Sequence, residues 1–113
     1  MTPRPELTPD ESQAFIKAFE RAVREIPTVR GFRVGRRITH GAAYESLAAE
    51  PADYVAIIDF DDLAGLQAYL VHPLHVELGA RFYSCLSAAM VYDFEVGGLE
   101  LLAEKDAGAG RAG

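Results

Sequence analysis

Cysteine is nearly absent from this sequence, since Cys85 is the single cysteine among 113 residues. One thiol cannot form an internal disulfide, so the sequence excludes a disulfide framework and fits a reducing compartment. The first residues, MTPRPELTPDE, show no basic segment followed by an apolar one, so no secretory signal is expected. We therefore expect a cytoplasmic protein. The apolar neighbours of Cys85 favour a small buried side chain over a reactive thiol.

Long apolar runs and excess positive charge are also missing. No apolar run approaches the roughly 20 residues that a membrane helix needs. The chain has 11 basic and 17 acidic residues, a formal net charge of −6, which argues against nucleic acid and anionic membrane surfaces as partners. Half of the residues are hydrophobic and a quarter are charged. The length and composition indicate one soluble globular domain.

The first regular element is a helix over residues 8–26. Thr8 and Glu11 have the spacing of a capping box, and Pro9 suits the first helical position. One face of this helix is apolar, and Pro27 ends it. The preceding residues, 1–7, contain two prolines, and we expect an irregular segment that cannot pair in a central strand.

Two strands follow, joined by a long connection. The alternation of residues 31–39 predicts a half-buried strand. Its arginines, Arg33, Arg36 and Arg37, are open to two interpretations: an anion site, or a solvated strand face, which we prefer. Residues 41–53 are interpreted as a mobile connection with a possible helical turn at 42–50. The strand over residues 54–60 is apolar on both faces, so both should be covered, one by helices and the other by a second subunit.

The stretch from residue 53 to 96 organises the rest of the chain. Asp61 or Asp62 should cap a helix that ends at His72-Pro73, where a second helix begins. Alternation predicts a final strand over residues 90–96. A flexible tail, 97–113, should follow the domain of residues 8–96, with a helical turn at 99–104.

The order helix–strand–strand–helix–strand is a ferredoxin-like βαββαβ unit, an α+β fold, without its first strand. The spatial strand order in that fold is 4-1-3-2, so the missing strand is central and its loss would leave backbone groups unpaired. We expect Met1 and Thr2 to be the end of this strand and the native chain to begin further upstream. A strand supplied by a partner chain is the alternative.

The segment AYLVHPLH, which ends at His75, resembles the stress-responsive α/β-barrel (Dabb) family. The Gly-Arg strand and the closing VYDF also fit the family, and the resemblance covers residues 8–96. It implies a homodimeric α/β barrel in which two sheets close on one another. The opening strand of the family, which usually carries a histidine, is lacking here.

The same resemblance suggests which residues form a site. A plant polyketide cyclase of the family uses a tyrosine and the second histidine of this motif, which match Tyr69 and His75. His75 would be a general base and Tyr69 its positioning partner. The pocket would also include Tyr54, Ala56 and His72, with Tyr54 standing where the cyclase has a histidine. Structural roles for these side chains are the alternative: we prefer a helix-capping or bridging role for His75, and a pocket-wall or core role for Tyr69.

Three function classes stay open. The first, which we prefer, is a dimer that binds a small hydrophobic ligand or has no catalytic role. The second is a cyclase or lyase that acts on a carbonyl compound through His75 and Tyr69. The third is a monooxygenase on the same dimeric architecture. No cofactor is expected, and no metal, because only His72 and His75 lie close together and zinc needs three or four ligands.

Overall fold

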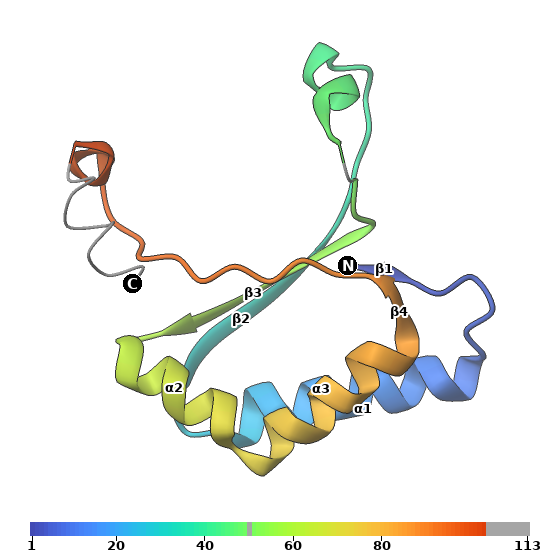
Figure 1. Ribbon diagram of the computed structural model, residues 1–113, viewed down its shortest axis with the longest axis vertical. Coiled ribbons are helices and arrows are strands. Elements are labelled where there is room, and N and C mark those ends of the chain that lie inside the picture. The colour runs from blue at the N-terminus through green and yellow to red at the C-terminus, as the bar shows by residue number, and fades with distance from the viewer. Residues whose placement is uncertain (50, 104–113) are drawn as a thin grey trace.

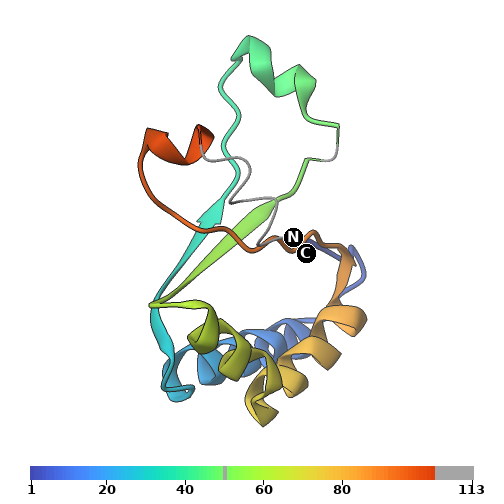
Figure 2. The same ribbon diagram turned by 60° about the vertical axis from the view of Figure 1, so that its left-hand side comes forward.

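The computed structural model describes residues 1–49 and 51–103. Its regular elements are, in chain order, β1 (Thr2–Pro3), α1 (Pro9–Glu25), β2 (Val29–Arg36), the 3-10 turn η1 (Ala43–Leu47), β3 (Tyr54–Phe60), α2 (Leu63–Val71), α3 (Pro73–Cys85), β4 (Leu86–Ala88) and the 3-10 turn η2 (Leu99–Leu102). The helices lie together on one side of the long β2–β3 ribbon (Figures 1 and 2). This is an α+β arrangement, as the sequence predicts.

Local signals set the helix boundaries. Thr8 and Glu11 form the predicted capping box at the start of α1, and Ile26, just before Pro27, is its C-cap. The Asp62 carboxylate accepts a hydrogen bond from the Gly65 N–H at 2.8 Å and caps α2. These side chains satisfy backbone N–H groups that a helix leaves unpaired in its first turn.

The strands form two antiparallel pairs, β1 with β4 and β2 with β3. Met1 joins the pairs through Tyr54: the α-amino group donates to the Tyr54 carbonyl at 2.7 Å, and the Tyr54 N–H donates to the Met1 carbonyl at 3.0 Å. The resulting order, β4-β1-β3-β2, is that of the ferredoxin-like fold. The central strand is represented by Thr2–Pro3.

Two predictions about the strands are wrong. Thr2 pairs with Ala88, as expected for the end of the first strand, but Pro3 pairs as well, with Leu86, although no proline was expected in a central strand. The Arg4 N–H donates to the Cys85 carbonyl at 3.0 Å and continues the pairing past the N–H that Pro3 lacks. The final strand ends at Ala88, and residues 90–96 form no strand. Alternating apolar residues form a strand only beside a partner, and β1 is too short to pair with residues 90–96.

The connection and the tail agree in part with the predictions. The 3-10 turn Ala43–Leu47 falls where a helical turn is expected, and η2, Leu99–Leu102, falls in the turn expected at 99–104. The mobility of residues 41–53 stays a prediction. Glu50 and most of the flexible tail expected at 97–113 lie outside the described residues.

The core lies between the helices and the strands. Its buried residues are Ala18, Ala22, Ile26, Tyr69 and Leu78, with aromatic side chains from α1, β3 and α3 packed around them. Cys85 is buried, which agrees with the structural interpretation of this thiol. On β3, Ile58 and Phe60 face this core, whereas Val55 and Ile57 on the other face are 53% and 42% exposed.

Candidate functional site

The break between α2 and α3 is built around His72. This residue is the C-cap of α2 and the N-cap of α3, with Pro73 at the first position of α3. The His72 Nδ1 accepts a hydrogen bond from the Leu74 N–H at 3.1 Å. Since the side chain satisfies a backbone donor of the first turn of α3, it serves as the N-cap of that helix.

Tyr69 and His75 meet across this break. Their ring centroids are 4.6 Å apart with the planes inclined at 56°, and Phe60 of β3 lies 5.1 Å from Tyr69 on another side. Tyr69 is 5% exposed, whereas His75 is half-buried. The break at His72-Pro73 lies between these two residues, which are six positions apart and become neighbours across it.

The hydrogen bond of His75 sets its tautomer. The Nδ1 lies 3.1 Å from the Leu70 carbonyl oxygen. A carbonyl oxygen accepts but never donates, so we assign the proton to Nδ1 from this partner. In the neutral imidazole, Nε2 then keeps a lone pair, which is the arrangement that a general base needs.

Burial controls the protonation of Tyr69. Desolvation raises the pKa of its phenol from the ordinary value of 10.0 to about 12, because a phenolate loses its water on burial. At neutral pH the hydroxyl is therefore a hydrogen-bond donor and not a base. Beside the His75 ring, it can donate a hydrogen bond to a developing oxyanion.

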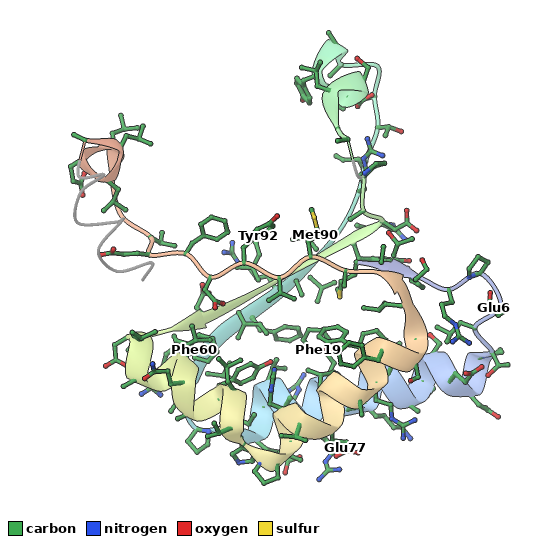
Figure 3. The ribbon with its side chains drawn as sticks, viewed as in Figure 1. Glu6, Phe19, Phe60, Glu77, Met90 and Tyr92 are labelled. Atoms are coloured by element: carbon green, nitrogen blue, oxygen red, sulfur yellow. The ribbon has the colours of Figure 1, made fainter. Side chains whose placement is uncertain are left out.

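A separate apolar cavity of about 380 Å³ lies between α1, β2 and the short β1–β4 pair. The apolar side chains of its wall include Phe15, Ile16, Phe19, Phe32, Val34 and Leu86. Tyr54, one of the residues that the sequence analysis places in a pocket with Tyr69 and His75, lines this separate cavity. Figure 3 shows Phe19 among side chains that fill the space between the helices and the strands.

The structure does not bring all of the predicted pocket residues together. Tyr69, His72, His75 and Ala56 do not line this cavity. Ala56 is on the same face of β3 as Tyr54, opposite Val34 of β2. The sequence analysis missed Phe15 and Phe19 as cavity residues, because the apolar stripe of a helix looks the same over a packed core and over a cavity.

The structure also bears on metal binding, anion binding and membrane insertion. In the part of the chain that the structure describes, no group of three His, Cys, Asp or Glu residues is arranged to hold a metal ion. None of the described helices is long and apolar enough to cross a membrane. Arg33, Arg36 and Arg37 are exposed, and no ion pair of these side chains occurs within the described residues.

Known proteins resemble this chain in sequence and in structure. Olivetolic acid cyclase from Cannabis sativa is 22% identical over 89 residues, which are 79% of this chain and 83% of that protein. A dimeric ferredoxin-like protein of unknown function from Jannaschia sp. is 28% identical, with a TM-score of 0.63 over 85% of this chain and 92% of the other. The protein At3g17210 of Arabidopsis thaliana is 18% identical, with a TM-score of 0.69 over 87% and 90% of the two chains.

These findings and the strand order define a small protein of the ferredoxin-like α+β class. Residues 2–96 match the stress responsive A/B barrel domain, Dabb. The chain belongs to this family, and the resemblance seen in its AYLVHPLH segment is confirmed.

Proposed function

We propose that this protein is a homodimer that binds a small apolar ligand in the cavity beside α1, without a catalytic role. The observation that carries the proposal is the cavity itself, about 380 Å³ in volume and walled mainly by aromatic and aliphatic side chains. Ligand sites in proteins have volumes of roughly 300–1,000 Å³ and mostly apolar walls. This cavity is at the small end of that range, which suits a ligand of one or two rings or a short chain.

The few polar groups of the cavity support a neutral ligand. The polar side chains of the wall are Ser12, Glu20 and Arg24 of α1 and Tyr54 of β3. Arg24 Nε lies 3.9 Å from Glu20 Oε2, so the positive charge has a carboxylate partner. A charged ligand would have to compete with this pair, whereas a neutral one leaves it undisturbed.

The homodimer is supported by the outer face of β3 and by the dimeric relative from Jannaschia sp.. Val55 and Ile57 are β-branched side chains on a strand face that the helices of the same chain do not cover. Contiguous exposed apolar surface often marks an interface. Two such faces packed on one another would form the barrel that gives the family its name.

Ligand binding is tested with the neutral fluorescent probe N-phenyl-1-naphthylamine. Ile16 lines the cavity but is 54% exposed, so Ile16→Asp should leave the fold intact while it places a charge in the apolar wall. We expect the wild-type protein to enhance the fluorescence of the probe saturably, and Ile16→Asp to weaken its binding by about tenfold or more.

The matched control is Val76→Asp, which introduces the same charge at a 62% exposed residue of α3 outside the cavity wall. It should bind the probe like the wild type. Equal binding by wild type and Ile16→Asp, or no binding by either, would exclude this cavity as the ligand site.

Cyclase or lyase chemistry is a second candidate, favoured by the contact between His75 and Tyr69. With a proton on Nδ1 held by Leu70, His75 Nε2 would remove a proton next to a substrate carbonyl, and the Tyr69 hydroxyl would donate to the enolate oxygen. The distant likeness to olivetolic acid cyclase supports this candidate.

The proton-abstraction step is tested by exchange of α-protons in D2O, followed by NMR with acetoacetyl-N-acetylcysteamine as the substrate. We expect His75→Ala to remove any catalysed exchange while the melting temperature stays nearly unchanged. His72→Asn, which keeps a capping side chain, should retain the exchange. A loss of several kcal/mol of stability in His75→Ala would instead identify a structural histidine.

A further inference from the structure

The outer face of the β2–β3 ribbon carries two opposite charges among apolar and small residues. The helices lie on the other side of this ribbon (Figures 1 and 2). Residues directly opposite each other in an antiparallel pair lie on the same face of the sheet. The cross-strand pairs of the outer face are Gly31 with Asp59, Arg33 with Ile57, and Gly35 with Val55. Among these six residues, Arg33 is the one cation and Asp59 the one anion.

Arg33 and Asp59 are both exposed, and neither forms an ion pair within residues 1–49 and 51–103. The Asp59 carboxylate lies beside Gly31, where an added methyl group would be 3.2 Å from Asp59 Oδ2. Because Gly31 has no side chain, β2 leaves this carboxylate uncovered. The outer face therefore presents an accessible anion and an accessible cation two residues apart along the ribbon.

These two charges restrict how a second copy can pack on the outer face. In the homodimer proposed above, Val55 and Ile57 are buried against the partner, and the charges on the same face lose water with them. Burial of an unpaired charge costs much more free energy than burial of a paired one. In a two-fold interface every contact between two different residues occurs twice. One arrangement, Arg33 against Asp59 of the partner subunit, therefore satisfies all four charges at once.

We propose that Arg33 of each protomer forms an ion pair with Asp59 of the partner subunit, so that these charges select a second copy of this chain as the occupant of the outer face. The inference rests on the homodimer proposed above. Sheets that pack face to face lie roughly 10 Å apart, a gap that a long arginine side chain and a carboxylate bridge together. The planar guanidinium can bind a carboxylate through two hydrogen bonds, which also fixes the orientation of the two sheets.

Charge reversal at the two positions tests whether the ion pairs join two chains. In a homodimer of Arg33→Asp, or of Asp59→Arg, both contacts bring like charges together, so dimerisation should weaken about tenfold or more. A heterodimer of these two variants has one native and one reversed ion pair. In an equimolar mixture, native mass spectrometry should therefore find more heterodimer than random association gives. An ion pair within one chain would produce no such excess.

The matched control is Arg81→Asp, which makes the same change of charge at an exposed residue of α3, on the helix side of the ribbon. It should dimerise like the wild type, and its mixture with Asp59→Arg should show no excess of heterodimer. The double variant Arg33→Asp/Asp59→Arg restores opposite charges in a single chain. Its homodimer should be about as tight as that of the wild type, which shows that the fold tolerates both reversals.

Three results would overturn the ion pairs and leave the proposed homodimer standing. The first is a wild-type dimer with no excess of heterodimer in the mixture of Arg33→Asp and Asp59→Arg. The second is an equal excess with Arg81→Asp, which would assign the preference to net charge. The third is unweakened dimerisation of both single variants, which would place the two charges outside the interface. A wild-type protein that stays monomeric at every concentration would contradict the homodimer itself.

Discussion

Tyr69 belongs both to the buried core and to the candidate catalytic pair. Its ring belongs to the buried core, and it also lies against His75 with 4.6 Å between the ring centroids. Burial raises the pKa of its phenol to about 12. The same desolvation that keeps the hydroxyl protonated as a donor makes the folded state sensitive to high pH.

A pH titration tests this property of Tyr69. Between pH 10 and about 12 the folded protein holds a proton on Tyr69 that the unfolded chain has lost. The unfolding free energy should therefore fall as the pH rises through this window, and Tyr69→Phe should lack that part of the fall. Ionisation of tyrosine can be followed by absorbance at 295 nm as the pH is raised. In this titration, Tyr69→Phe should lack the tyrosine that ionises at the highest pH. Loss of a tyrosine that ionises near pH 10 would contradict the assignment.

The sequence predicted the residues at the helix break better than it predicted the cavity. The AYLVHPLH segment led to Tyr69 and His75, which the structure brings together. Phe15 and Phe19 carried no signal of a cavity, because their spacing is the same in a packed core. What decides between the two is the volume left between α1 and the strands, which depends on contacts distant in sequence.

At the scale of elements, the junction of α2 and α3 depends on one side chain. The His72 imidazole caps the first turn of α3. We expect His72→Ala to lower the unfolding free energy by about 1 kcal/mol, and His72→Asn to restore most of it. Urea denaturation measures both variants. An Asn variant no more stable than the Ala variant would mean that the cap contributes nothing.

The elements that local signals define were predicted correctly, and so was the strand over residues 54–60, whereas the final strand was not. The Thr8 capping box and the break at Pro73 lie where the sequence places them. Residues 90–96 have the alternation of a strand, yet no strand forms there in the structure. Residues pair only where a neighbouring strand lies beside them, and β1, Thr2–Pro3, pairs no further along than Ala88.

At the scale of the whole molecule, the outer face of β3 is apolar and is left uncovered by the helices of the single chain. The sequence predicted a strand covered on both faces, and the helices cover one of them (Figure 2). Ile57, 42% exposed on the other face, should be buried in the proposed homodimer. Ile57→Asp should therefore weaken dimerisation about tenfold or more, because it buries a charge at the interface. Val76→Asp on α3 is the control and should dimerise normally.

The mass of the full-length protein in solution tests the proposed assembly most directly. One chain has a mass of 12.3 kDa. Sedimentation equilibrium at micromolar concentration should give twice that mass, and Ile57→Asp should shift the equilibrium toward the single chain. A wild-type mass of 12.3 kDa at every concentration would contradict the homodimer.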